Sequence, residues 1–302
     1  MAKTIIKAPA KPAVTKAPVK AAAPAPNATL SKELAEASAP AIHQPSRTAL
    51  IAHADEFATM ESGFDNVGPR DVIIPRLTIL QALSPQLQRN KPEFIQGAAA
   101  GMFCDTATGD VFEGPLELVP CFFKRVYLEW APRNTGKGLV RNHETDDAIL
   151  DRCSPDAKGR MITPDGNYVA ETATYYVINL TSGGRRSFVP LSSTQMRAAR
   201  RWMTQLTAER LTGSNGRSFT PPIFYRSWMA TVSEQSNNEG SWFGWSFSPG
   251  RPIVEIDSSR GLLREAQSFY DTVREGEVAG DVGGEDYAQP NIEREDVDAG
   301  AM

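Results

Sequence analysis

Alternating apolar and polar positions mark several short segments of this chain, and this period of two residues is typical of β-strands. The longest strand candidate is Leu116–Trp130, which is rich in apolar and aromatic residues and in which Pro120 is expected to mark a bulge because proline lacks the ladder donor. Residues 101–112 and residues 173–191 each read as two short strands around a glycine-containing turn, which predicts two β-hairpins. The pattern therefore indicates a mainly β protein.

An apolar period of 3.6 residues predicts one helix among the strands. Ser192, Ser193 or Thr194 is the expected N-cap, because a hydroxyl oxygen accepts a hydrogen bond from the free amides of the first turn. Gly213 is expected to stop the helix after about Thr212. The apolar face of this helix comprises Met196, Ala199, Met203 and Leu206.

The remaining predicted elements lie at the two ends of the body. Residues 71–84 contain a β-branched run that Pro75 interrupts, which suits an edge strand. A hairpin over residues 223–247, a short strand over 252–257 and a helix over 261–274 complete the order. An oligonucleotide-binding (OB) barrel has the order of three strands, a helix and two strands, and the extra N-terminal strands would be an elaboration of it. The sequence therefore predicts an OB-like barrel, mainly β with minor α, with one inserted helix and an additional C-terminal helix.

Composition changes at both ends and divides the chain into three parts. Residues 1–48 form a predicted disordered basic arm rich in Lys, Ala and Pro, because such a segment buries too little apolar surface to offset the entropy of ordering. Residues 49–270 are expected to form a single domain, and residues 271–302 an acidic disordered tail. The net charge of −4 hides this asymmetry, since the first 26 residues carry +5 and the tail carries −8.

Composition and motifs argue against several functional classes. The odd number of cysteines, Cys104, Cys121 and Cys153, and the lack of a C-x-x-C pair favour a reducing compartment. No secretory signal and no apolar run of about 20 residues is evident, so a cytoplasmic protein is expected. Residues 134–138 are only a fragment of a phosphate-binding loop, and the acids of residues 105–110 lack the spacing of an EF-hand.

The sequence also lacks the patterns of a catalytic or metal site. His43, His53 and His143 are irregularly spaced, which disfavours a zinc site shared with the cysteines. Only His143 lies within residues 77–270, where the predicted core is found, and without a G-x-S-x-G elbow it is interpreted as a surface loop histidine. We therefore expect a protein that is not an enzyme and that needs no metal or cofactor.

Cationic residues interleaved with aromatic residues are the main candidate chemistry. The period of two places Phe123, Arg125 and Tyr127 on one face of the longest strand, opposite a more apolar face. Rings stack on bases and neighbouring cations neutralise phosphates, so this combination suits single-strand binding. A long loop expected over residues 131–169 supplies further cations. The predicted nucleic-acid-binding residues are Lys124, Arg125, Tyr127, Trp130, Arg133, Lys137, Arg185, Arg186, Tyr225, Arg226, Trp228 and Trp242.

Alternatives stay open for these residues. Aromatic residues in strands usually belong to the core, and arginines at turn tips are usually solvated. A further cluster of arginines on the predicted helix is compatible with contact to phosphate, to a partner or only to water, and water is the favoured interpretation. This cluster comprises Arg197, Arg200, Arg201 and Arg210.

The acidic tail carries a separate hypothesis. Its ten carboxylates mimic a nucleic-acid backbone electrostatically, so the tail is predicted to occupy a basic groove when DNA is absent and to reach partner proteins when DNA displaces it. A purely solubilising tail is the alternative. The predicted partner-binding residues are Glu285, Asp286, Tyr287, Glu293, Glu295, Asp296 and Asp298.

A β body with one helix, cations beside aromatics and an acidic C-terminus resembles the single-stranded-DNA-binding proteins of tailed bacteriophages. The segments that carry the resemblance are Ile74-Pro75-Arg76-Leu77, Leu80-Gln81-Ala82-Leu83-Ser84-Pro85 and Leu128-Glu129-Trp130-Ala131-Pro132-Arg133. The resemblance implies an OB fold that binds the strand, a tail that contacts replication proteins, and dimers in some members. This chain ends in Gly300-Ala301-Met302, whereas the best-known phage tails end in an aromatic residue.

Taken together, these features predict a non-enzymatic protein that binds and protects single-stranded DNA during phage replication or recombination. The alternative is a structural or assembly protein of the virion with a flexible basic arm. A nuclease is a third class, which is disfavoured because the sequence shows no cluster of acids that would hold its metal ions.

Overall fold

The computed structural model describes residues 73–276, apart from 133, 134, 136, 238, 239, 258 and 259, together with residues 56, 59, 60, 63, 65 and 66. Contacts divide the chain into two units, residues 1–63 and 64–302, and every described strand belongs to the second. The predicted basic arm and the acidic tail beyond residue 276 lie outside the described residues. The predicted domain boundaries stay predictions.

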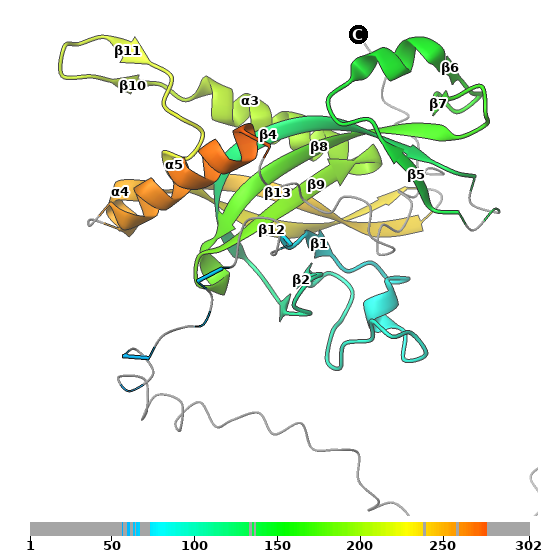
Figure 1. Ribbon diagram of the computed structural model, residues 1–302, viewed down its shortest axis with the longest axis horizontal. Helices are drawn as coiled ribbons and strands as arrows, with labels where there is room; N and C mark the ends of the chain where they lie inside the picture. The colour runs from blue at the N-terminus through cyan, green and yellow to red at the C-terminus, as the bar shows by residue number, and fades with distance from the viewer. Residues whose placement is uncertain are drawn as a thin grey trace, which may run out of the picture. The chain divides into compact units, whose positions relative to one another are not determined.

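The second unit consists mainly of strands, with few helices (Figure 1). The strands are β1 (Leu77–Ile79), β2 (Phe103–Asp105), β3 (Val111–Phe112), β4 (Leu116–Trp130), β5 (Leu139–Asn142), β6 (Ser154–Pro155), β7 (Met161–Ile162), β8 (Tyr168–Asn179), β9 (Arg185–Ser192), β10 (Leu211–Thr212), β11 (Ser218–Phe219), β12 (Arg226–Asn237) and β13 (Gly240–Pro252). The helices are α3 (Met196–Ala208), α4 (Ile253–Ile256) and α5 (Gly261–Arg274), with 3-10 turns η1 (Pro85–Leu87), η3 (Asp147–Arg152), η4 (Leu180–Ser182) and η5 (Ser193–Gln195). The predicted fold class, mainly β with minor α, is confirmed.

A curled eight-stranded sheet forms the centre of the unit. β4 and β8 are antiparallel along nearly their whole length, and β9 pairs with the other edge of β8. β12 pairs with only the first residues of β4, at Leu116–Leu118, and continues as a long hairpin with β13. The chain order β4, β8, β9, α3, β12, β13 is three strands, a helix and two strands, which is consistent with the predicted OB-like barrel.

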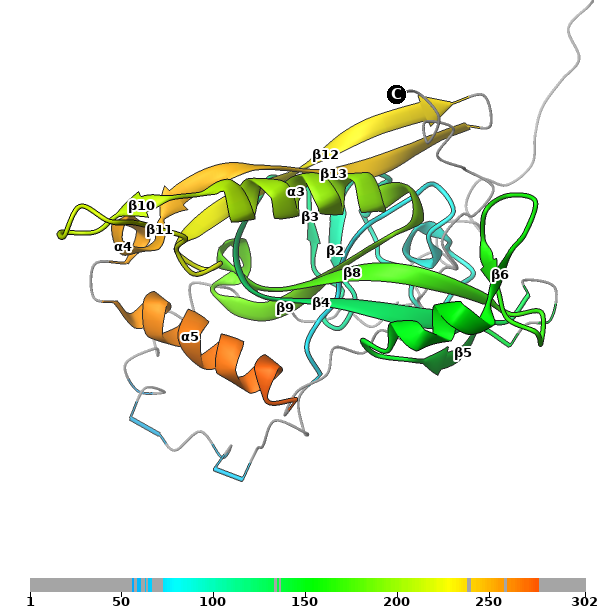
Figure 2. The same cartoon turned by 90° about the horizontal axis from the view of Figure 1, so that it is seen from above.

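The central strands are buried on both faces, and each face has its own apolar cluster. Tyr175 and Val177 of β8 point into a cluster that contains Trp202 of α3, whereas Tyr176 and Ile178 point into a cluster that contains α5. This follows from the two-residue period of a strand, and it explains why this part of β8 is apolar without alternation. Figure 2 shows α3 and α5 on opposite sides of β4, β8 and β9.

Two glutamine side chains, rather than a neighbouring strand, bond the backbone of β13 at its outer edge. The Nε2 of Gln81 donates to the carbonyl oxygen of Phe243 at 2.9 Å, and its Oε1 accepts from the Phe243 amide at 2.9 Å. The Oε1 of Gln195 accepts from the Trp245 amide at 3.1 Å. These bonds satisfy edge groups that would otherwise be open to pairing. They also connect β13 to the segments that follow β1 and β9, which closes this side of the barrel.

Replacing Gln81 with alanine is expected to lower the free energy of unfolding by about 1–3 kcal/mol, because the Phe243 amide loses its partner in a partly buried setting. The urea midpoint of the purified variant measures the loss. Gln267→Ala, on the exposed side of α5, removes the same side chain where burial is absent and is the matched control. Equal midpoints for the two variants would show that the glutamine bonds do not hold β13.

Most predicted elements are confirmed, and three differ. The strand at 116–130 and the C-terminal helix at 261–274 have the predicted bounds, and the predicted hairpins form. The central helix has Gln195 as its N-cap, with no side-chain cap hydrogen bond, so the prediction of Ser192, Ser193 or Thr194 as N-cap is wrong. It ends at Ala208 instead of Thr212, since residues 211–219 form a small hairpin of their own. Residues 253–256 are helical, and the expected long loop contains β5, β6, β7 and η3.

Candidate nucleic-acid interface

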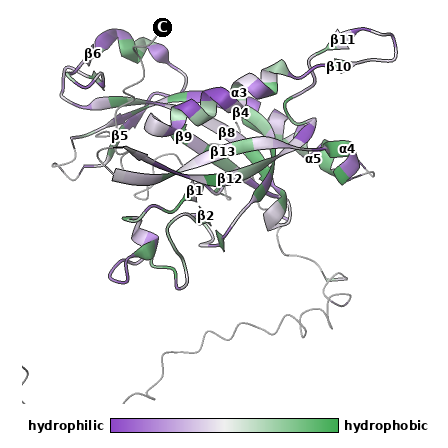
Figure 3. Cartoon of the chain, turned by 180° about the vertical axis from the view of Figure 1, so that it is seen from behind, coloured by the Kyte–Doolittle hydropathy of each residue, from purple (hydrophilic) through white to green (hydrophobic). Residues whose placement is uncertain are grey.

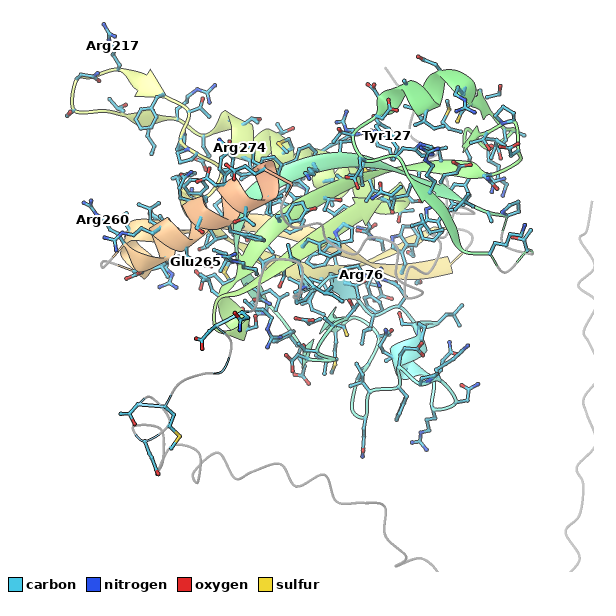
Figure 4. The ribbon with its side chains drawn as sticks, in the orientation of Figure 1. Arg76, Tyr127, Arg217, Arg260, Glu265 and Arg274 are labelled. Carbon is cyan, nitrogen blue, oxygen red and sulfur yellow. The ribbon has the colours of Figure 1, made fainter. Side chains whose placement is uncertain are left out.

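Three of the predicted stacking rings belong to the core, so this part of the predicted surface is wrong. Trp228 is fully buried, Trp130 is 2% exposed and Tyr127 is 6% exposed. Trp228 packs edge-on against Trp202 of α3, with ring centroids 6.2 Å apart. Tyr127 packs with Ile149 of η3, which covers the strand face predicted to be open (Figure 4). None of these three rings can stack on a base in this structure.

The other two predicted rings, Tyr225 and Trp242, are only partly buried. The guanidinium carbon of Arg226 lies 5.6 Å from the centre of the Tyr225 ring, and its Nη1 donates to the Tyr225 hydroxyl at 3.2 Å. This cation covers part of the ring that a base would need. The structure therefore does not bring the predicted aromatic residues together on one exposed surface.

Most predicted cations are engaged in ion pairs that join separate elements. Each of these arginines places its guanidinium within 3.1 Å of a carboxylate: Arg125 with Glu171, Arg185 with Asp105 and Asp110, Arg186 with Glu265, and Arg226 with Glu209. Hydrogen bonding from Arg185 lowers the pKa of Asp110, so this carboxylate stays ionised beside it. Binding a phosphate here would require the arginine to leave its carboxylate. These ion pairs therefore stabilise the fold, and the paired arginines do not line an open groove.

The predicted lysines and the remaining arginine have different settings. The Nζ of Lys124 lies 6.0 Å from the centre of the Tyr176 ring, and Lys137 is exposed. Arg133 lies outside the described residues, as does the whole set of tail residues from Glu285 to Asp298. Lys137 forms no ion pair and no cation–π contact with any residue that the structure describes.

The side chain of His143 is only 8% exposed, so its interpretation as a surface loop histidine is wrong. Its Nε2 lies 2.8 Å from Oε2 of Glu129, and the Nδ2 of Asn167 donates to the other carboxylate oxygen at 2.7 Å. Burial raises the pKa of Glu129, but the hydrogen bonds from Asn167 and His143 outweigh it and the pKa lies below its ordinary value. This buried polar cluster anchors the segment that follows β5 to β4.

The structure instead exposes a row of arginines on α3 and on the β10–β11 hairpin that follows it. The helix buries Met196, Ala199, Trp202 and Leu206, and its 3.6-residue period turns the arginines to the opposite side. In Figure 3, purple hydrophilic stretches alternate with green ones along α3. We name as the arginine ridge the residues Arg197, Arg200, Arg201, Arg210 and Arg217.

Acidic residues are scarce in the segment that carries the arginine ridge. Residues 193–222 contain these five arginines and a single acid, Glu209, which is held by Arg226 of β12 at 3.0 Å. The Arg200 side chain is 70% exposed and its Nη2 lies 3.9 Å from Glu171, at the limit of an ion pair. Arg201 and Arg217 form no ion pair with any residue that the structure describes. Such a concentration of one sign attracts polyanions.

Backbone carbonyl groups hold Arg210, the ridge residue between α3 and the hairpin. The Nη1 of Arg210 donates to the carbonyl oxygens of Thr207 and Glu209, both at 2.8 Å, and so satisfies acceptors that are left free where α3 ends. Arg217 lies in the turn of the hairpin and points away from the body in Figure 4. The sequence interpretation assigned the helix arginines to water. The sequence signal for a cationic surface here is the run of thirty residues, 193–222, with five arginines and one acid.

The described residues hold no group of three or more histidine, cysteine or acidic side chains that could bind a metal ion. Among the same residues, no helix is long and apolar enough to cross a membrane. The model of one family, described as Pam3 phage gp34-like protein, matches residues 45–279, which points to a bacteriophage origin. No curated protein and no solved structure gave a match.

Proposed function

We propose that this chain, which belongs to the Pam3 phage gp34-like family, is a non-enzymatic protein that binds and protects single-stranded DNA during phage replication or recombination. The observation that carries the proposal is the arginine ridge, whose side chains are exposed and in which Arg201 and Arg217 form no ion pair with any residue that the structure describes. Lysine and arginine contacts to phosphates supply the main, sequence-independent part of nucleic-acid affinity. The strand of DNA would run over α3 and the hairpin, not across the central strands of the sheet, which are buried on both faces.

Two features favour a single strand over a duplex as the ligand. Charge alone attracts any polyanion, but the OB-like order of elements occurs in many proteins that bind single strands. Beside the ridge, the β10–β11 hairpin exposes apolar side chains that can contact unstacked bases. We further propose that the acidic residues from Glu285 to Asp298 regulate binding or recruit partners, with the ridge as the cationic surface they would meet.

Titration of a fluorescent oligothymidine with the full chain tests the proposal. We expect tight binding at low salt that weakens steeply as salt rises, with a slope of about 0.7 per phosphate contact for a single strand. Duplex DNA and RNA of equal length are measured in parallel, and we expect the single strand of DNA to bind best. Labelled DNA incubated with magnesium or manganese is expected to stay intact. No binding at low salt, or cleavage, would overturn the proposal.

A structural or assembly protein of the virion is the second candidate function. It is favoured by large apolar side chains on projecting segments, such as Leu83, which is 84% exposed between β1 and β2. Such side chains suit contacts with neighbouring subunits. Mass spectrometry of purified particles would find the protein at high copy number if this function holds, and its absence from particles would exclude it.

A further inference from the structure

The β10–β11 hairpin is a projecting element that contributes almost nothing to the core. It consists of two residue pairs, Leu211 opposite Phe219 and Thr212 opposite Ser218, and it stands away from the sheet in Figures 1 and 2. The amide of Gly213 donates to the carbonyl oxygen of Arg217 at 2.9 Å and closes the turn. Neither Leu211 nor Phe219 belongs to any of the apolar clusters.

Two apolar side chains sit together on this hairpin in contact with solvent. Directly opposite residues of an antiparallel pair share a face, so the Leu211 and Phe219 side chains lie side by side. Phe219 is 47% exposed and Leu211 is 39% exposed. We name these two residues the hairpin pair. Exposing these apolar side chains to water is unfavourable, and they gain no packing in the core. This indicates that the pair makes a contact outside this fold.

The charged surroundings of the hairpin pair identify the kind of contact. Arg210 directly precedes Leu211, and Arg217 lies two residues before Phe219. No acid occurs from Arg210 to Pro222. A protein partner of this surface would need an acidic and apolar surface, whereas an unpaired nucleotide supplies both a phosphate and a flat apolar base in one unit. The hairpin also continues directly from α3, so one strand can follow the arginine ridge and reach the hairpin.

We propose that the hairpin pair is a stacking platform, and that Phe219 determines the preference of this protein for single-stranded over double-stranded nucleic acid. This inference rests on the proposed function. An unpaired base offers its π-face to the Phe219 ring, with Leu211 supporting the ring from the neighbouring strand and Arg217 near the phosphate. In a duplex the faces of the bases are already stacked on one another, so the ring gains little there.

The expected effect is large enough to measure. Replacing Phe219 with alanine in the full chain weakens binding to oligothymidine by about 5- to 150-fold, which is the usual contribution of one stacked base. Binding to duplex DNA changes less than about twofold, and the salt slope for the single strand is unchanged because no cation is removed. Phe219→Leu, which keeps an apolar side chain without a ring, is expected to recover only part of the loss. Phe94→Ala, on the loop between β1 and β2, removes another partly exposed ring and is the matched control.

Cross-linking gives a second measurement that does not depend on affinity. An oligonucleotide with 5-iodouracil, irradiated in complex with the wild-type chain, is expected to attach to Phe219, and mass spectrometry of the peptides identifies the site.

If the wild-type chain binds no single strand at all, the proposed function fails and the inference fails with it. If glutamine substitutions in the arginine ridge abolish binding while Phe219→Ala leaves it unchanged, the proposed function stands and the inference is overturned. A change of oligomeric state in Phe219→Ala, measured by light scattering, with DNA binding intact, also overturns it in favour of contact between copies.

Discussion

A variant that carries Arg200→Gln, Arg201→Gln and Arg217→Gln is expected to bind oligothymidine on the order of 100-fold more weakly than the wild-type chain at about 50 mM salt. Each substitution removes one cation of the arginine ridge without burying or unpairing another group, because these side chains are exposed. The slope of the logarithm of affinity against the logarithm of salt is expected to fall by about 2, at about 0.7 for each lost phosphate contact. Fluorescence anisotropy over a series of salt concentrations measures both quantities.

The control for this variant changes the same net charge elsewhere. Arg89→Gln, Lys158→Gln and Arg264→Gln remove three exposed cations from the loop after η1, from the turn between β6 and β7, and from α5. We expect the control to bind within about threefold of the wild-type chain, since charges beyond the Debye length are screened. Equal losses in the two variants would show that overall charge, and not the arginine ridge, governs binding.

Replacing Trp202 with alanine is expected to lower the free energy of unfolding by about 3–5 kcal/mol, the largest effect on stability that the fold predicts for one residue. The Trp202 ring is fully buried and stacks on Phe247 of β13, with centroids 3.8 Å apart and planes 8° apart. It also stacks on Tyr175 of β8 at 4.3 Å, so it joins the two parts of the curled sheet through α3. Urea unfolding followed by circular dichroism measures the change.

Two further variants make the Trp202 experiment interpretable. Trp202→Phe keeps an aromatic ring of smaller size and is expected to lose less than the alanine variant. Phe219→Ala removes an exposed ring and is expected to change the free energy of unfolding by less than about 0.5 kcal/mol. A loss below about 1 kcal/mol for Trp202→Ala would mean that α3 is not a structural part of the barrel.

Regular elements could be predicted from the sequence because their signals are local. The apolar and aromatic residues of Leu116–Trp130 and the predicted helix over Gly261–Arg274 each reflect the surroundings of one continuous segment, and both bounds agree with the structure. The end of α3 was placed too late because the hairpin turn at Gly213 was read as a helix stop. Local signals determine the secondary structure of a segment, but they do not show which other segment packs against it.

The predicted interface failed for this reason. The period of two correctly placed Tyr127 on a separate face from Leu128, but the cover over that face comes from η3, about twenty residues later, in a segment that was expected to be a loop. Likewise, Arg185 and Arg186 find their carboxylates about eighty residues away in the chain. A strand pattern shows two faces and cannot say which is open to solvent. The excess of arginine over acids in residues 193–222 can be counted from the sequence without such knowledge.

The glutamine bonds along β13 make one boundary of the barrel depend on sequence in an unusual way. A ladder between two strands uses backbone groups that every residue except proline provides, so it tolerates substitution. Here the donor and acceptor come from the side chains of Gln81 and Gln195. Two substitutions would therefore remove these hydrogen bonds. The bared margin of β13 would then be a template for another chain, so the first consequence of losing these amides is self-assembly into aggregates. We expect the loss of these hydrogen bonds to appear as lower solubility during expression, before it appears in any assay of DNA binding.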